Sequence, residues 1–306
     1  MEGFRALFPR GNPSKTVNPP SCLPAYLKVK EGAMAAIEKY LDHSEKLKVG
    51  DIDWEAGRKA GVSEEERFIL TYFADIEGQT ILYLRDLLHT DVIGDPDTIA
   101  FLSMWNYEEY FHGQALSRLL AECGHPLEKD RIARVRGKAS LKETLNAWGA
   151  TLLSKIFKRQ FPAVFMTWGA INELSTLRGY ERLETLSSNP VLKLLCRRIA
   201  KQERRHFAWY YNSARERLEK SKTARRITRF LLKHFWSPVG AGVKTDEEVL
   251  TLTRLIFEGE GGAKIIEGID GRIAGLPGLE DLKLLTAYLG RPSPSPLLSL
   301  THRFNH

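Results

Sequence analysis

The residues with the clearest capacity for chemistry are two glutamate–histidine pairs with the same spacing. Glu109 is followed three residues later by His112, and Glu203 is followed three residues later by His206. Positions three apart lie on one face of a helix, so each pair can direct a carboxylate and an imidazole toward one point. Because carboxylates and imidazoles are metal ligands, each pair is a candidate for metal binding.

Two further glutamates, Glu77 and Glu173, lie singly on two other stretches with helical periodicity. A Glu-x-x-His pair from each of two helices, with one glutamate from each of two others, is the ligand set of ferritin-like di-iron and di-manganese bundles. Two divalent cations would balance four carboxylates, which are costly to bury unpaired. The pattern therefore predicts a dinuclear site. The alternative, that these are partly solvated or core hydrogen-bonding residues, stays open.

A third pair with this spacing, Glu122 and His125, has a different setting. Gly124 lies inside it and Pro126 follows it, and both residues are typical of the end of a helix. The pair is therefore not expected to project from a continuous helix face, and we interpret its spacing as coincidental.

Each of the six candidate ligands interrupts an apolar stripe whose members recur every three or four residues. All six are therefore expected to be buried. The stripe around Glu77 comprises Leu70, Phe73, Ile81, Leu84 and Leu88; that around Glu109 and His112, Leu102, Trp105, Leu116 and Leu119; that around Glu173, Met166, Ala170, Leu177 and Tyr180; that around Glu203 and His206, Leu192, Leu195, Ile199 and Tyr210.

The elements that must position these residues are all helices, since no period-two alternation indicates a strand. The predicted fold is all-α, a ferritin-like four-helix bundle core with additional flanking helices. Ser63 and Glu66 form a capping box that opens the helix carrying Glu77. The expected helices span about 24–46, 63–89, 97–123, 140–157, 162–186 and 190–220, with two or three shorter ones between 246 and 289.

The expected domain organisation is a single helical domain with extended ends. Residues 1–24 are rich in proline and are expected to form an extended arm, and residues 291–306 a Pro/Ser-rich tail. Residues 25–290 are expected to form one ferritin-like domain, with the di-metal core between 62 and 215.

Composition restricts the partners and the compartment. With 45 basic and 38 acidic residues the formal net charge is +7, which favours acidic partners such as nucleic acid, an acidic carrier protein or an acidic electron donor. The three cysteines are far apart, which argues against a disulfide framework and indicates a reducing, cytoplasmic location. No apolar run is long enough to predict a transmembrane helix, and the first residues do not resemble a secretory signal.

Residues 62–215 resemble the soluble acyl-(acyl-carrier-protein) desaturases, di-iron enzymes that insert a double bond into a fatty acyl chain. Two motifs and one threonine carry the resemblance. The first motif comprises Trp105, Glu108, Glu109, His112, Gly113 and Leu116; the second comprises Glu203, Arg205, His206 and Tyr210; and Thr176 follows Glu173 at the family's spacing.

The resemblance implies an O₂-dependent oxidoreductase with two iron ions, for which manganese is an alternative. Glu77 and Glu173 would each bind one metal, Glu109 and Glu203 would bridge the two, and His112 and His206 would each bind one. It also implies an acyl carrier protein as substrate carrier, an acidic electron donor such as a ferredoxin, and a homodimer, rather than nucleic acid.

The resemblance also assigns catalytic roles to three further residues. Thr176 would face the oxygen-binding side of the metal pair, although a threonine within a helix can instead hydrogen-bond the carbonyl four residues back. Trp105 and Tyr210 could pass electrons, and simple core packing is the alternative for both.

Two positions depart from the family pattern. Gln202 stands where the family has aspartate, and Phe111 where it has arginine, so the electron-entry route and the redox partner stay open. Gln202 can still hydrogen-bond a metal-binding imidazole.

Two other di-iron classes each require a residue that this sequence lacks. Ile199 and Leu116 occupy positions where related N-oxygenases need histidine and ribonucleotide reductases need tyrosine, which disfavours both classes. A different di-iron oxidase or oxygenase acting on a small amine or hydrocarbon remains an alternative, as does a non-catalytic metal-binding protein. A long, narrow apolar cavity beside Thr176 would favour an acyl substrate, and a short pocket a small one.

Basic side chains that could dock an acyl carrier gather on two predicted segments, although a solvated helix face is the alternative interpretation. The first group comprises Lys193, Arg197, Arg198, Lys201 and Arg204, and the second comprises Arg225, Arg226 and Arg229.

Overall fold

The structure is a computed structural model that describes residues 31–88, 90–128, 130–131, 155–241 and 243–290. Within these residues the secondary structure is helical, and the only strand-like pairing is an isolated bridge between Ala241 and Lys244. The all-α fold class is therefore confirmed. The predicted arm, the tail and most of the predicted helix 140–157 lie outside the described residues.

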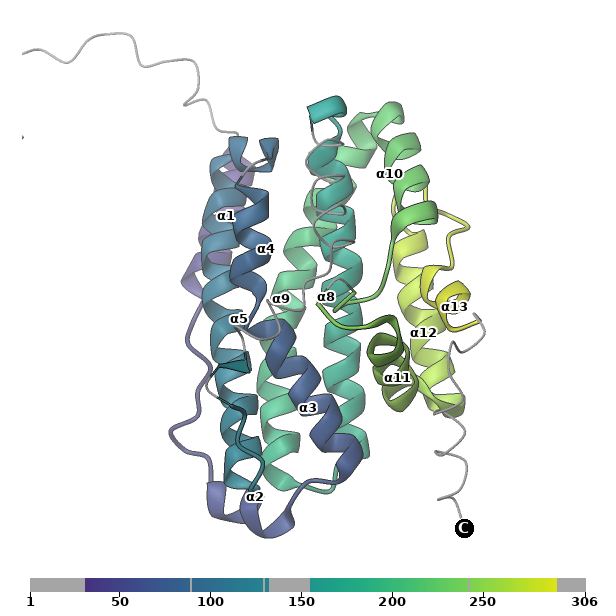
Figure 1. Ribbon diagram of the computed structural model, residues 1–306. Coiled ribbons are helices and arrows are strands. Elements are labelled where there is room, and N and C mark those ends of the chain that lie inside the picture. The colour runs from purple at the N-terminus through teal and green to yellow at the C-terminus, as the bar shows by residue number, and fades with distance from the viewer. Residues whose placement is uncertain (1–30, 89, 129, 132–154, 242, 291–306) are drawn as a thin grey trace, which may run out of the picture.

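Figure 1 shows the order of the helices along the chain. In chain order they are α1 (Glu31–Asp42), α2 (Trp54–Ala60), α3 (Glu64–Glu77), α4 (Thr80–Leu87), the 3₁₀ turn η2 (Asp91–Gly94), α5 (Pro96–Glu122), α8 (Phe161–Leu186), α9 (Pro190–Lys220), α10 (Lys222–Phe235), α11 (Asp246–Phe257), α12 (Gly259–Ala274) and α13 (Leu284–Leu289).

Local sequence signals set several helix starts. The Ser63 hydroxyl accepts from the Glu66 backbone N–H while the Glu66 carboxylate accepts from that of Ser63, so the predicted capping box opens α3. At the start of α9 the Asn189 side chain accepts from the next free backbone N–H groups, and Pro190 occupies the first helical position. These signals lie within a few residues of one another, which is why they could be recognised in the sequence.

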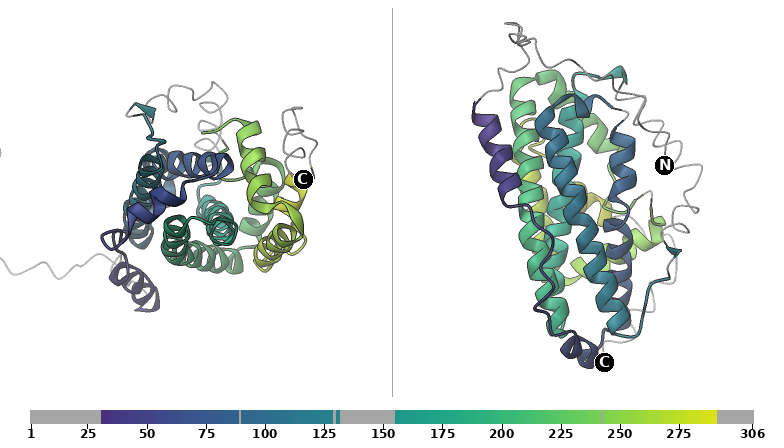
Figure 2. Two further views of the ribbon diagram at one scale, coloured as in Figure 1. Left: turned by 90° about the horizontal axis from the view of Figure 1, so that it is seen from below. Right: turned by 90° about the vertical axis from the view of Figure 1, so that its left-hand side faces the viewer.

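The four helices that carry the candidate ligands, α3, α5, α8 and α9, run side by side through the molecule (Figures 1 and 2). The most extensive helix–helix contact joins α8 and α9, and the next joins α3 and α5. Helix α1 lies against α5, α2 contacts α5 and α9, and α10, α11 and α12 contact α8. Buried apolar side chains from α1 to α13 form one continuous core cluster.

The predicted single helix from 63 to 89 is wrong in one respect. Helix α3 ends at Glu77 itself, Gly78 and Gln79 form a turn, and α4 begins at Thr80. The break changes which faces point inward, so Ile81 and Leu88, expected on the buried stripe, are 48% and 56% exposed. Glycine is a poor helix former, which explains why the helix breaks at Gly78. The apolar periodicity alone does not indicate this break.

Helix α10 was not expected from the basic stretch that follows Ser221. Its buried residues, Ala224, Thr228, Leu231 and Leu232, recur every three or four positions, so the helical pattern was present despite the many cations around it. The two or three short helices expected between 246 and 289 are present as α11, α12 and α13. Among the described helices, none has both the length and the apolar character needed to cross a membrane.

Candidate metal centre

The structure brings all six predicted ligands together in the core, each no more than 7% exposed. Two groups of side chains each offer ligand atoms that all lie within 4.8 Å of one another. One group contains Glu77 and His112, the other contains Glu173 and His206, and Glu109 and Glu203 belong to both. The two shared carboxylates are therefore placed to bridge two cations, with one carboxylate and one imidazole left for each.

Both histidines present the same ring nitrogen to the centre. The outward Nε2 of His112 lies 2.7 Å from Gln202 Oε1, and the outward Nε2 of His206 lies 2.7 Å from Glu108 Oε2. Each acceptor holds a proton on Nε2 and so directs Nδ1 inward, where its lone pair would bind a cation once any second proton has left. His112 Nδ1 lies 3.2 Å from Glu203 Oε1, and His206 Nδ1 lies 3.0 Å from Glu109 Oε1.

The inward-facing atoms test whether these residues fit a metal. The Nδ1 atoms of both histidines and both carboxylate oxygens of Glu203 are buried and lack a hydrogen bond of acceptable geometry. Buried polar atoms are normally hydrogen-bonded, and a bound ion is one explanation for a converging group of exceptions. Two imidazoles and four carboxylates also match the donor set of iron or manganese, so the residues fit a pair of such ions.

The two carboxylates outside the shared pair are each held by an aromatic donor. The Tyr180 hydroxyl donates to Glu77 Oε1 at 2.6 Å, and the Trp105 indole N–H donates to Glu173 Oε1 at 3.1 Å. Each bond uses one carboxylate oxygen and leaves the other for a cation. The sequence places Tyr180 on the apolar stripe around Glu173 but does not indicate that it contacts a candidate ligand. Its position seven residues after Glu173, on the same helix face, was the available signal.

The centre is closed on one side by a chain segment that follows α1. The backbone N–H of Glu45 donates to Glu108 Oε1 at 3.1 Å, and its carbonyl accepts from Gln202 Nε2 at 2.7 Å. Arg205 Nη2 also donates to Glu108 Oε1 at 2.6 Å, and the Tyr40 hydroxyl donates to Oε2 at 3.3 Å. Sequence reasoning missed Tyr40 and Glu45, because no spacing connects them with the ligands.

The surroundings raise the pKa values of two of the four carboxylates and lower those of the other two. Burial and the neighbouring Glu109 carboxylate raise the pKa of Glu77 well above its ordinary value, and burial and Glu203 raise that of Glu173 in the same way. Burial also acts to raise the pKa of Glu109, but the adjacent Glu77 and the two nearby imidazoles outweigh it and hold that pKa well below its ordinary value. The pKa of Glu203 is lowered because the two nearby imidazoles outweigh burial and the Glu109 charge.

The histidine pKa values move in the opposite sense to the effect of burial. Burial alone would lower the pKa of His112, but the Glu109 and Glu203 carboxylates close to its Nδ1 outweigh burial and raise the pKa to about 10. The pKa of His206 is raised well above its ordinary value, because Tyr40 and three carboxylates, those of Glu108, Glu109 and Glu173, outweigh burial. Without a cation, these shifts favour the protonated forms of Glu77, Glu173 and the two imidazoles and the ionised forms of Glu109 and Glu203.

Two glycines allow the close helix contacts on which the centre depends. A Cβ atom on Gly113 of α5 would lie 3.3 Å from Glu77 Cβ and from the backbone nitrogen of Gly78. A Cβ atom on Gly169 of α8 would lie 2.4 Å from the ring of Tyr210. The glycine that follows His112 in the first motif thus lets α3 approach α5 at the position of Glu77.

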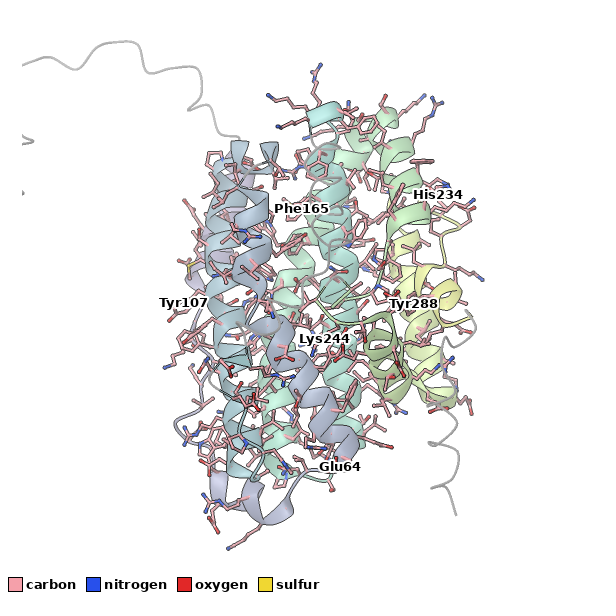
Figure 3. All side chains as sticks on the ribbon, viewed as in Figure 1. Glu64, Tyr107, Phe165, His234, Lys244 and Tyr288 are labelled. Carbon is pink, nitrogen blue, oxygen red and sulfur yellow. The ribbon has the colours of Figure 1, made fainter. Side chains whose placement is uncertain are left out.

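Of the three predicted catalytic residues, Trp105 and Tyr210 are buried beside the centre. Their rings meet edge to face at 6.3 Å, and Trp105 contacts the ligand Glu173 directly through its N–H. Phe101 and Phe165, the latter labelled in Figure 3, complete an aromatic group around Tyr210. Burial and an edge-to-face contact are compatible with both electron transfer and core packing for this pair.

The third predicted catalytic residue, Thr176, is half-buried and lines a small apolar pocket. The cavity has a volume of about 40 Å³ and is bounded by Phe73 of α3, by Thr176 and Gly179 of α8, and by residues of α11 and α13. Phe73 also packs against Tyr180, with ring centroids 4.8 Å apart, and Tyr180 binds Glu77. The pocket is therefore one aromatic layer away from the centre. It is short, since one water molecule occupies about 30 Å³ of liquid.

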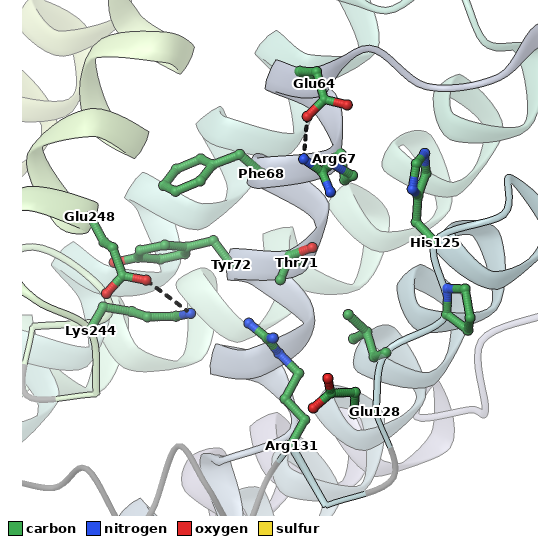
Figure 4. A pocket seen from close by; sticks show the side chains of 12 residues that line it. Glu64, Arg67, Phe68, Thr71, Tyr72, His125, Glu128, Arg131, Lys244 and Glu248 are labelled. Carbon is green, nitrogen blue, oxygen red and sulfur yellow. Dashed lines mark hydrogen bonds and ion pairs between the residues drawn. The ribbon is translucent and has the colours of Figure 1, made fainter. Parts of the chain in front are cut away.

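A larger cavity of about 380 Å³ lies on the outer side of α3 (Figure 4). Arg131 and Lys244 border it and both bind Asp75, which is 3% exposed. Arg131 makes two bonds, of 2.6 and 2.7 Å, and Lys244 Nζ makes one of 2.6 Å. Acidic and basic side chains alternate around this cavity, so its charge indicates no single ligand class.

The Glu122–His125 pair and Phe111 do not belong to the two groups of converging side chains. Glu122 ends α5 and binds Arg58 at 2.6 Å, and Gly124 adopts a φ of 86° before His125, which agrees with the interpretation of this pair as coincidental. Phe111 packs against Tyr107 and Tyr110 with Lys46 Nζ 4.7 Å from its ring centre.

The predicted basic docking faces are largely engaged in internal contacts. On α9, Arg197 binds Glu184, Arg198 binds Asp51 and Arg204 binds Glu181. Near α10, Arg225 donates to the carbonyls of Leu218 and Glu219, and Arg229 binds Asp281. These contacts agree better with a solvated helix face than with a set of cations reserved for a partner.

Comparisons of the chain with models of protein families, with curated proteins and with solved structures found no significant match. The geometry of the centre therefore supplies the basis for assigning a function.

Proposed function

We propose that the protein is an O₂-dependent oxidoreductase whose active centre is a pair of iron ions held by Glu77, Glu109, His112, Glu173, Glu203 and His206. One observation carries the proposal: buried inward-facing nitrogen and oxygen atoms converge without hydrogen-bond partners. A cation between them would satisfy atoms that otherwise remain costly to bury.

The chemistry supplied by a reduced pair of iron ions is the activation of O₂ for oxidation of an unactivated C–H bond. In a desaturation, one O₂ takes two hydrogens from the substrate together with two electrons and two protons from a donor, which yields an alkene and two waters. The chain's own residues position the ligands through Gln202, Glu108, Tyr180 and Trp105, and the apolar helix faces exclude bulk water from the site.

The resemblance of residues 62–215 to acyl carrier protein desaturases supports an acyl chain as the substrate. In this form of the proposal the substrate arrives on an acyl carrier protein, an acidic donor such as a ferredoxin supplies the electrons, and the protein acts as a homodimer. The substitutions at Phe111 and Gln202 leave the route of the electrons to be established by experiment.

The short pocket beside Thr176 favours a second candidate. A cavity of about 40 Å³ does not accommodate a long acyl chain, so a di-iron oxidase or oxygenase acting on a small amine or hydrocarbon fits this conformation better. The two candidates share the centre and differ in the substrate, so one experiment can compare them.

The test begins with the metal content of protein purified without chelators. We expect about two iron ions per chain, and their loss in Glu109→Ala and Glu203→Ala variants. The Glu122→Ala variant, which changes the coincidental Glu-x-x-His pair, should retain full metal content. Less than one metal per chain in the unaltered protein, unaffected by the first two substitutions, would show that the six residues are not a metal site.

The substrate class is tested on the reduced, iron-loaded protein exposed to O₂. An absorbance transient that decays faster with an acyl carrier substrate, together with an alkene product detected by mass spectrometry, would support the desaturase. Acceleration by small amines or hydrocarbons alone would support the second candidate. Bound iron that does not react with O₂ would contradict both enzyme assignments and leave a metal-binding protein.

A further inference from the structure

Each histidine has its outward Nε2 bonded to one side chain, which we call its support: Glu108 supports His206, and Gln202 supports His112. The two supports occupy equivalent positions in the sequence but differ in chemistry. Glu108 and Gln202 each stand immediately before a shared carboxylate ligand, Glu109 and Glu203 respectively. Glu108 on α5 binds the histidine of α9, at 2.7 Å, and Gln202 on α9 binds the histidine of α5, also at 2.7 Å. The two halves thus support each other through the same contact, made once with a carboxylate and once with a neutral amide.

This difference changes the donor strength of the two imidazoles. A ring N–H that donates to a carboxylate makes a charge-assisted hydrogen bond, which increases the basicity of the other ring nitrogen. An amide oxygen carries no net charge and has a smaller effect. His206 is therefore the stronger ligand, and His112 the weaker.

Further contacts fix the two supports in place. Arg205 and the Glu45 backbone N–H occupy Oε1 of Glu108, so Oε2 remains directed at His206. Gln202 donates its amide N–H to the Glu45 carbonyl, which keeps its oxygen directed at His112. Neither support can exchange roles without breaking one of these part-buried bonds.

We propose that the two metal positions differ in affinity, with the position at His206 and Glu173 filled before the position at His112 and Glu77, and that Glu108 and Gln202 set this order. The inference rests on the proposed dinuclear site and adds a selectivity to it. A centre of this kind loads stepwise, so its second position can accept a different divalent ion from the first.

The order is tested by anaerobic titration of chelator-treated full-length protein with Co²⁺, which reports ligation through its visible absorption. We expect two steps whose dissociation constants differ by at least about tenfold. His206→Ala should remove the tight step and His112→Ala the weak one. Loss of the weak step in His206→Ala would reverse the proposed order and overturn it.

The cause is tested by exchanging the supports. Glu108→Gln should weaken the tight step by about 10- to 100-fold and leave the weak step unchanged, which is the usual effect of altering the partner of a metal-binding histidine. Gln202→Glu should strengthen the weak step. This second variant keeps the test informative if the Glu108→Gln variant fails to fold. Glu184→Gln, the same change in a carboxylate that binds Arg197 at the surface, is the matched control and should alter neither step.

The outcomes separate this inference from the function on which it rests. Absence of Co²⁺ binding in the unaltered protein would contradict the dinuclear site itself. Two steps of equal affinity, or two unequal steps unaffected by both Glu108→Gln and Gln202→Glu, would overturn the inference about the supports and leave the metal site intact.

Discussion

Protonation links the six ligand residues into one unit. Without a cation, Glu77 and Glu173 hold protons because burial and a neighbouring carboxylate raise their pKa values, and both imidazoles are held protonated by the carboxylates around them. Divalent cations would take the place of these protons and supply positive charge to the same carboxylates and imidazoles.

Metal binding should consequently release protons at neutral pH, up to four for two divalent ions. The raised pKa values mean that the metal-free protein binds more protons than the loaded protein, so affinity should rise with pH up to the pKa of His112, about 10. Calorimetric titration in buffers of different ionisation enthalpy measures the release. An enthalpy that is independent of the buffer would contradict the prediction.

At the scale of the element, Gly113 governs the approach of α3 to α5. Gly113→Ala places a Cβ atom 3.3 Å from Glu77 Cβ and the Gly78 nitrogen, so α3 must shift and take the Glu77 carboxylate with it. We expect weaker metal binding at the His112 position, measured by the same Co²⁺ titration.

The matched control for this change is Gly268→Ala on α12. A Cβ atom there has no neighbour within 4 Å, so the substitution should leave metal binding unchanged. It should also raise the stability of the protein by about 0.5–1 kcal/mol, since alanine favours a helix over glycine. Equal metal binding in both variants would show that the close contact is not needed.

Helix α3 is also held by the buried Asp75, which binds Arg131 and Lys244. The Lys244 side chain is only 6% exposed, so Asp75→Asn removes the closer of its two carboxylate partners and leaves Glu248 Oε1 at 3.6 Å. We expect a loss of about 3–5 kcal/mol in the free energy of unfolding, measured with urea. Glu64→Gln, which breaks the exposed pair with Arg67 on the same helix, is the control and should have little effect. Similar small losses in both variants would contradict the prediction.

At the scale of the whole molecule, the centre joins four helices that are far apart in sequence. Cations that bind only the folded chain stabilise it by mass action, by about 2.7 kcal/mol at a free concentration one hundred times the dissociation constant. Iron(II) added anaerobically should therefore raise the unfolding temperature, and a chelator should reverse the rise. Glu109→Ala, which removes a carboxylate shared by both positions, should show no rise; an equal rise in this variant would place the stabilising metal elsewhere.

The sequence by itself determined the helical class, the long helices α5, α8 and α9 and the identities of the six residues that converge. Helix periodicity and the i, i+3 spacing of Glu109 and His112 act within a few residues, so they can be recognised without a structure. The break after Glu77 and helix α10 were missed although their local signals, Gly78 and a buried three-to-four spacing, were present.

Only the tertiary structure decided how the ligands are supported. His206 and Glu108 are separated by 98 residues, Tyr180 and Glu77 by 103, and Gln202 and Glu45 by 157. No local periodicity relates such positions, because the contacts depend on how whole helices pack and on where the segment after α1 crosses them. The proposed difference between the two metal positions depends on these distant contacts, since the Glu-x-x-His pairs themselves are alike.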